Sequence, residues 1–243
     1  MNEIIAIIPA RAGSKSVINK NIKPLADHPL IAYSIAAAKL SKYISRVIVS
    51  TDSEEYSQIA NIYGAETPFI RPASISKDNS TDLDFFHHCI DWFDQNEPNT
   101  PEYWVHLRPT TPLRDPKLID SAISQFVNNL EATSLRSAHK APESPFKWFK
   151  EDNGYFKGIV GDENNEIYNQ PKENFTDVFV PDGHVDIVKK SHIVSKNNLH
   201  GSKILAFKAP FINEVDSIEE FEMIEYQILK KGSVLKDYLD NGR

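Results

Sequence analysis

Short apolar runs alternate along the chain with stretches in which apolar residues recur every three or four positions. The apolar runs cover Ile4–Pro9, 46–52 and 103–107. Apolar runs this short are typical of strands buried in a parallel sheet, and the first run is also rich in isoleucine. Helical spacing follows in the stretches 30–40, 53–63, 85–93 and 116–130. The alternating order predicts an α/β fold with a doubly wound, mostly parallel sheet.

The pattern changes between residues 136 and 202, where short strand-like runs, aromatic side chains and turn residues replace the alternation. The runs are Tyr155-Phe156, 178–180 and 185–188. Nearby aromatic side chains need a surface to pack against, which favours an insertion of β hairpins over a linker. Because such an insertion has little core of its own, we expect it to pack against a second copy in a homodimer. The chain, 1–243, is then a single domain that carries one insertion.

The loop after the first apolar run has the chemistry of an anion site. Ala12, Gly13 and Ser14 are small enough for backbone N–H groups to approach a ligand, and three cations, Arg11, Lys15 and Lys20, surround them. A triphosphate fits this arrangement. Neither of the two standard nucleotide-binding glycine motifs occurs, so solvated charges on an ordinary loop are the alternative.

An acidic segment, 213–220, precedes the last predicted helix, 221–229. Glu214 and Asp216 alternate along an extended segment and are close enough to share a hard cation through oxygen ligands. The alternative is an acidic helix start with Asp216 or Ser217 as the N-cap. That alternative explains Asp216 better than Glu214.

Composition narrows the class of protein. With 243 residues, 40% of them hydrophobic and 25% charged, the chain can bury a full core, and a net charge of −7 argues against a nucleic-acid binder. No apolar run is long enough to span a bilayer, and the N-terminus lacks the plan of a signal peptide, so we expect a cytoplasmic protein without a membrane partner. The lone cysteine, Cys89, lies in a predicted helix and is expected to be a buried, inert thiol.

The segment Pro9-Ala10-Arg11-x-Gly13-Ser14-Lys15, continuing to Lys20-Asn21, resembles the signature of the acylneuraminate cytidylyltransferases, which make CMP-sugar acids. The resemblance spans nearly the whole chain and is strongest in residues 4–115. It implies a Rossmann-like core with CTP as co-substrate, contacted by Ala10, Arg11, Gly13, Ser14 and Asn21. It also implies that Arg71 and Thr81 lie beside the cytosine base, although Thr81 or Asp82 would serve equally as the N-cap of the next helix.

The segment Arg108 to Asp115 resembles the Q-P-T-S-P-L-R turn of the family at the sugar-acid site, with Arg108 in place of glutamine. The resemblance implies that Arg108, Thr110 and Thr111 contact the substrate. A guanidinium could hold the substrate carboxylate through paired N–H bonds. The alternative is that Arg108 pairs with an internal acid such as Asp115.

The insertion matches the family less well. Gln170-Pro171-Lys172 stands where the family has Q-P-R, and residues 179–183 stand where it has F-R-P-N-G. In the second motif Val180 replaces an arginine, so a cation is lost, and Asp182 replaces an asparagine, so an acid stands in place of an amide. The resemblance implies that Lys172 and Asp182 contact the substrate and that this segment forms a dimer interface reaching into the neighbour's site. It further implies that Glu214 and Asp216 bind Mg²⁺.

Together these features predict the transfer of a cytidylyl group from CTP to the anomeric hydroxyl of a sialic acid-like nonulosonic acid, with release of pyrophosphate, for cell-surface glycan biosynthesis. Arg11, Lys15, Lys20 and Mg²⁺ would neutralise the phosphate charge. Open alternatives are an acceptor such as 3-deoxy-octulosonic acid or an alditol phosphate, for which Arg108 and Arg114 supply cations, and a non-catalytic nucleotide-binding homologue. A glycosyltransferase with this core would normally show Asp-x-Asp at a strand end, and none stands at a predicted strand end.

Overall fold

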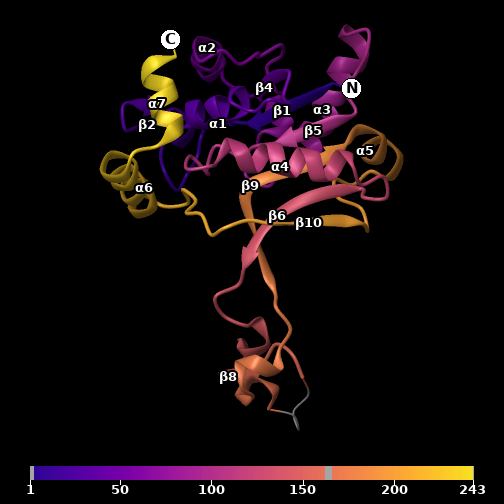
Figure 1. Ribbon diagram of the computed structural model, residues 1–243, viewed down its shortest axis with the longest axis vertical. Coiled ribbons are helices and arrows are strands. Elements are labelled where there is room, and N and C mark those ends of the chain that lie inside the picture. The colour runs from indigo at the N-terminus through magenta and orange to yellow at the C-terminus, as the bar shows by residue number, and fades with distance from the viewer. Residues whose placement is uncertain (1–2, 162–165, 243) are drawn as a thin grey trace.

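The computed structural model describes residues 3–161 and 166–242, which form an α/β body with a projecting arm (Figure 1). A six-stranded sheet runs through the body in the order β10-β6-β9-β5-β1-β4. Its strands are β1 (Ile4–Pro9), β4 (Arg46–Ser50), β5 (Tyr103–His106), β6 (Ser134–Lys140), β9 (Phe179–Lys189) and β10 (Ile204–Lys208). Neighbours run parallel except that β9 is antiparallel to both β5 and β6, which confirms the mostly parallel sheet.

Seven α-helices, five short 3-10 helices and two small hairpins make up the other described elements. The helices are α1 (Leu30–Lys39), α2 (Glu54–Ile62), α3 (Asp82–Asn96), α4 (Pro116–Val127), α5 (Lys190–Lys196), α6 (Ile218–Lys231) and α7 (Val234–Asn241). The hairpins pair β2 (Pro24–Leu25) with β3 (His28–Pro29), and β7 (Phe149–Asp152) with β8 (Tyr155–Gly158). Short polar side chains set the helix starts: Ser53, Thr81 and Ser217 accept backbone N–H groups as N-caps.

Strand β1 shows how the core is divided. Ile4, Ala6 and Ile8 pack into one cluster with α1, α4, α6 and α7, while Ile5 and Ile7 pack into a second cluster with α3. Alternate side chains of a strand point to opposite faces of the sheet, so a strand covered on both faces needs an unbroken apolar run. This accounts for the Ile-rich sequence at the start of the chain.

The helix predicted near the C-terminus is present, but its bounds differ and it is not the last helix. The helix predicted at 221–229 begins earlier and ends later, as α6, and a further helix, α7, follows it. Helix α7 was overlooked because its segment is short and mainly polar. Ser233 caps it, and Leu235 and Leu239 are buried against α1, so tertiary packing stabilises this helix.

The predicted insertion, 136–202, is divided between the central sheet and the arm. Val185, Ile187 and Val188 were expected in the insertion, but they are buried in the middle of the central sheet as part of β9. Strands β6 and β9 run on from the body into the arm, which carries the hairpin of β7 and β8 (Figure 1). Residues 162–165 of the expected insertion lie outside the described residues.

Aromatic side chains on the arm remain exposed in the single chain. Tyr155 and Phe156 are 75% and 76% exposed, and Trp148 and Phe149 are each 47% exposed. Stacking of Phe146 on Phe175, with 5.2 Å between ring centroids, gives the arm only a small core of its own. The arm therefore presents an apolar surface that the body does not cover.

Two further observations concern the chain as a whole. Cys89 is fully buried in α3, and burial raises the pKa of its thiol to about 12, as expected for an inert cysteine. Among the described residues, no helix combines the length and the apolar character that a membrane crossing requires.

Candidate active site

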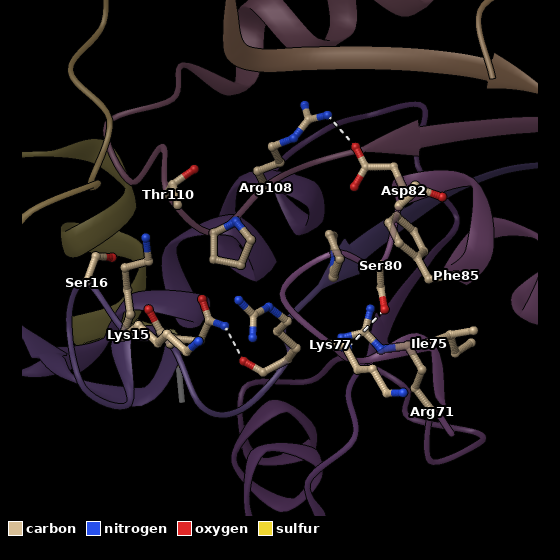
Figure 2. A pocket seen from close by; sticks show the side chains of 17 residues that line it. Lys15, Ser16, Arg71, Ile75, Lys77, Ser80, Asp82, Phe85, Arg108 and Thr110 are labelled. Atoms are coloured by element: carbon tan, nitrogen blue, oxygen red, sulfur yellow. Dashed lines mark hydrogen bonds and ion pairs between the residues drawn. The ribbon is translucent and has the colours of Figure 1, made fainter. Parts of the chain in front are cut away.

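A pocket of about 440 Å³ lies beyond the carboxyl ends of β1 and β5, where open α/β sheets commonly bind ligands (Figure 2). Figure 2 shows Lys15 and Ser16 on one side of the pocket and Ser80, Phe85 and Arg71 on the other. Among the described residues that line it, one is acidic, Asp82, and six are basic: Arg11, Lys15, Lys20, Arg71, Lys77 and Arg108. The pocket therefore favours a strongly anionic ligand.

The loop after β1 is held by the neighbouring strand. Ala10 N–H donates to the carbonyl of Ser50 at 2.9 Å, and Ala12 N–H donates to Asp52 Oδ1 at 2.8 Å. Asn21 Nδ2 donates to the carbonyl of Arg11 at 3.0 Å, which closes the loop on itself. The Ala12 N–H is therefore already occupied and is not free to donate to an anion.

Gly13 gives the loop its shape. Its φ is +72°, in the left-handed region that residues with a Cβ adopt only with strain. No atom lies within 4 Å of a Cβ built at this position, so backbone conformation is the reason for a glycine here.

Lys20 reaches into the pocket from the next turn of chain. Its side chain is 13% exposed, its Nζ donates to the carbonyl of Val215 at 2.9 Å, and Asp216 Oδ1 lies 3.9 Å away. Burial lowers the pKa of Lys20. An anionic ligand would therefore stabilise its charged form.

Arg71 is the most deeply buried cation of the pocket. Its Nε and one Nη atom are buried and have no hydrogen-bond partner within the part of the chain that the structure describes. Burial lowers the pKa of this guanidinium, which lies over the ring of Phe85. Buried donors without acceptors are costly, so this position suits a ligand that supplies an acceptor.

Thr81 both caps α3 and lines the pocket. Its hydroxyl accepts the N–H of Asp84, and the Asp84 carboxylate accepts the N–H of Thr81, which together form a capping box. The structural role that the sequence suggested for Thr81 is therefore confirmed, and its contact with the base stays a prediction. Asp82 is the first residue of the helix and does not cap it.

Arg108 is held between two carboxylates. Its Nη1 lies 2.9 Å from Asp186 Oδ2, and its Nη2 lies 2.8 Å from Asp82 Oδ2 (Figure 2). The alternative that Arg108 pairs with an internal acid is therefore confirmed, but the partner suggested for it, Asp115, is wrong. Asp115 instead caps α4 by accepting the N–H of Lys117.

The acid pair does not itself line the pocket, but the chain between its two residues contacts Lys20 and Thr110, which do. Val215 N–H donates to the carbonyl of Thr110 at 2.8 Å, and Glu214 Oε1 accepts the N–H of Gly183 at 2.8 Å. Burial raises the pKa of Glu214, and Asp216 adds to this effect, whereas the Asp216 side chain is 76% exposed. Because Ser217 caps α6, Asp216 is not needed as the N-cap.

The acid pair fits a magnesium ion that a nucleotide helps to hold. Over residues 3–161 and 166–242, no three acidic, histidine or cysteine side chains gather closely enough to enclose a metal ion on their own. Mg²⁺ is usually held by one or two carboxylates together with substrate phosphates and water. Glu214 and Asp216 match that incomplete ligand set.

The structure brings some of the expected residues together and leaves others apart. Those that line the pocket are Arg11, Ser14, Lys15, Lys20, Asn21, Arg71, Thr81, Arg108 and Thr110. Thr111 is fully buried and Asp182 is 5% exposed, with its carboxylate accepting from the Ser137 hydroxyl and the His184 N–H. Lys172 lies on the arm, where its Nζ donates to the carbonyl of Pro142.

Several residues of the site were not anticipated. Lys77 and Ser80 line the pocket from the polar stretch before α3, in which only Thr81 was named as a contact of the nucleotide. Asp186, which holds Arg108, stands in the otherwise apolar stretch 185–188. A carboxylate in a buried strand requires a partner, so the sequence could have indicated that Asp186 pairs with a cation.

The sequence is similar to a family of known proteins and to several of its members. The family model described as cytidylyltransferase matches residues 5–196. N-acylneuraminate cytidylyltransferase of Escherichia coli is 33% identical over 205 residues, which cover 84% of this chain and 46% of that protein. Post-translational flagellin modification protein B of Campylobacter coli is 28% identical over 246 residues, which cover 98% of this chain and all of that protein.

Solved structures share the fold. A CMP:2-keto-3-deoxy-manno-octonic acid synthetase complexed with CTP superposes with a TM-score of 0.70 at 14% identity, over 94% of this chain and 99% of that one. The family match, which covers most of the chain, agrees with the loop after β1 and with the pocket at the strand ends. The chain therefore belongs to the cytidylyltransferase family.

Proposed function

We propose that this chain transfers a cytidylyl group from CTP to the anomeric hydroxyl of a nonulosonic acid and releases pyrophosphate. One observation carries the proposal: six basic side chains converge on a single pocket at the strand ends of a cytidylyltransferase fold. The names of relatives support the acceptor class, because they include N-acylneuraminate cytidylyltransferase and CMP-N,N'-diacetyllegionaminic acid synthase.

The proposed reaction is an in-line displacement at the α-phosphorus. The acceptor oxygen forms a bond to this phosphorus while the bond to the bridging oxygen of the β-phosphate breaks, and the hydroxyl proton leaves to a base. Negative charge grows on the phosphate oxygens and on the departing pyrophosphate. Arg11, Lys15 and Lys20 stabilise that charge from the loop after β1, and Arg71 with Thr81 lies at the base end of the nucleotide.

Glu214 and Asp216 are proposed to hold a magnesium ion together with the phosphates of the nucleotide. When bound, the ion would neutralise phosphate charge and lower the pKa of a coordinated water. Lys20, which contacts this segment through Val215, links the acid pair to the phosphate end of the pocket.

The acceptor end is proposed to lie at Arg108 and Thr110. An alditol phosphate would need unpaired cations there, but Arg108 already pairs with Asp82 and Asp186. The other candidate, Arg114, is 1% exposed and donates to the carbonyls of Arg108, Gly183 and His184. Among the described residues, the acceptor end therefore offers no unpaired arginine, which disfavours an acceptor that carries a doubly charged phosphate more than one that carries a single carboxylate.

The apolar arm supports a homodimer, and we propose that Lys172 acts in the pocket of the neighbouring copy. Asp182, at the base of the arm, is proposed to shape that region from within the sheet. We also propose that the protein acts in the cytoplasm, where CTP is made.

The test is pyrophosphate release from CTP and Mg²⁺ with a panel of acceptors. We expect release with one or more nonulosonic acids and much less with 3-deoxy-octulosonic acid or an alditol phosphate. Replacing CTP by UTP or ATP should abolish the signal. Release with an alditol phosphate alone would contradict the proposal, as would normal CTP binding without turnover of any acceptor.

A further inference from the structure

A carboxylate already occupies the anion site of the loop after β1. Asp78 Oδ1 lies 2.7 Å from Arg11 Nη2, and Asp78 Oδ2 forms an ion pair with Lys15 Nζ. Both cations line the pocket and belong to the set that would neutralise the triphosphate. They also hold the pKa of Asp78 below its usual range, so the side chain is a full negative charge at neutral pH.

The chain holds Asp78 in place through a tight turn. Lys77 N–H donates to Ser80 Oγ at 2.9 Å, and Ser80 N–H donates to the carbonyl of Lys77 at 3.1 Å, so Asp78 stands inside the turn. On one side Ser76 Oγ donates to the carbonyl of Pro72, and on the other Thr81 begins α3 through its capping box. The backbone at Asp78 is therefore held by its own segment, and its carboxylate reaches Arg11 and Lys15 from there.

Arg11 and Lys15, the two cations that pair with Asp78, differ in how exposed their side chains are. The Lys15 side chain is 82% exposed and that of Arg11 is 34% exposed, compared with 46% for Asp78. Ion pairs this exposed are weak. A highly charged ligand can therefore take both cations from Asp78, and they can return to it when the ligand leaves.

We infer that Asp78 is an internal counter-anion that competes with the phosphate chain of the nucleotide for Arg11 and Lys15, and so sets the affinity of the pocket for polyphosphates. This inference rests on the proposed function, because it assigns the same two cations to the triphosphate. Asp78 lowers the affinity for every ligand that needs both cations and leaves the affinity for an uncharged nucleoside unchanged. It also favours release of pyrophosphate after the reaction.

The test is direct binding without turnover. Calorimetry would measure the affinity of wild-type protein and Asp78→Asn for pyrophosphate, CTP and cytidine, each with Mg²⁺ and without an acceptor. Asparagine keeps the size of the side chain and removes its charge. We expect pyrophosphate and CTP to bind about three- to tenfold more tightly to the variant, and cytidine to bind equally.

Asp94→Asn is the matched control. Asp94 also forms an ion pair with a lysine, Lys190, and at 44% exposure it is as accessible as Asp78, but it lies on α3 outside the pocket lining. This variant should bind all three ligands as the wild type does. Added salt should narrow the difference between wild type and Asp78→Asn, because salt screens exposed ion pairs.

The outcomes separate the inference from the proposed function. If the wild type binds CTP and Asp78→Asn binds it equally or more weakly, the competition is refuted while the cytidylyltransferase assignment stands. A loss of CTP affinity that more Mg²⁺ restores would make Asp78 a metal ligand instead. If the wild type binds neither CTP nor pyrophosphate, both the inference and the proposed function are wrong.

Discussion

Gly183 N–H donates a hydrogen bond of 2.8 Å to Glu214 Oε1, so strand β9 holds one carboxylate of the acid pair beside the pocket. Other side chains approach Gly183 closely. A Cβ at position 183 would lie 2.0 Å from Thr111 Oγ1 and 3.2 Å from the Glu214 carboxyl, which explains why glycine stands here. Asp216, two residues on, is 76% exposed, and its Oδ1 lies 3.9 Å from Lys20 Nζ.

The acid pair yields a test of the metal site. Glu214→Gln keeps an oxygen that can accept from Gly183, and Asp216→Asn removes a charge from a position that does not cap α6, so both variants should fold normally. Because Mg²⁺ requires carboxylate charge, we expect each variant to need at least about tenfold more Mg²⁺ for half-maximal turnover. Partial rescue by Mn²⁺ is expected as well. Unchanged Mg²⁺ dependence in both would mean that the triphosphate holds the metal alone.

Removing the cations of the loop after β1 should affect turnover far more than stability. For Arg11→Ala and Lys15→Ala we expect kcat to fall by about two to three orders of magnitude, because each cation stabilises developing phosphate charge. Thermal unfolding should change little, since the ion pairs with Asp78 are exposed. Lys203→Ala, which breaks an exposed pair with Glu131, is the control. Near-normal activity of either variant at saturating CTP and Mg²⁺ would remove the loop from the catalytic site.

The exposed arm predicts the oligomeric state. We expect light scattering at micromolar concentration to give the mass of a dimer, because association would bury the aromatic side chains of the arm. Phe156→Ser should shift the equilibrium toward monomer. Leu130→Ser removes a side chain that is 88% exposed and lies outside the arm, and it should leave the dimer intact. A monomer mass for the wild type would show that the arm has another role.

Buried histidines predict a loss of stability in mild acid. Burial, helped by the charge of Arg114, lowers the pKa of His184 to about 4 from the ordinary value of 6.5, and burial lowers the pKa of His106 as well. At these two positions the unfolded chain therefore binds more protons than the native chain. Stability should decrease as pH falls from about 6.5 to about 4. Urea unfolding at several pH values measures how the free energy of unfolding depends on pH, and His184→Gln should make this dependence weaker. An unchanged dependence would exclude His184 as a contributor.

Local patterns were enough to predict part of this molecule. The apolar run of β1, the loop from Arg11 to Lys20 and the cap at Thr81 depend on neighbours in sequence, and all were recognised. The partners of Arg108 could not be predicted, because Asp82 and Asp186 lie 26 and 78 residues away and only the fold brings them together. The same applies to Asp78, whose ion pair with Arg11 spans 67 residues.

Strand β9 was misjudged for a related reason. Its sequence is apolar only over part of its length, so the buried segment was interpreted as a short run within an insertion. In the structure one strand of 11 residues serves both the central sheet and the arm, and spacing along the sequence does not show where the sheet ends. Helix α7 was missed because its stability comes from contacts with α1.

The pairing of Arg108 with Asp82 and Asp186 also bears on how such a protein can diversify. In the proposed function the nucleotide lies against the loop after β1 and the segment before α3, and the acceptor lies against the turn after β5 and β9. Arg108 joins the two ends, so a substitution there would disturb both. Residues of the turn that do not carry this link, such as Thr110, are freer to vary, and a lineage could exchange one sugar acid for another while its use of CTP is preserved.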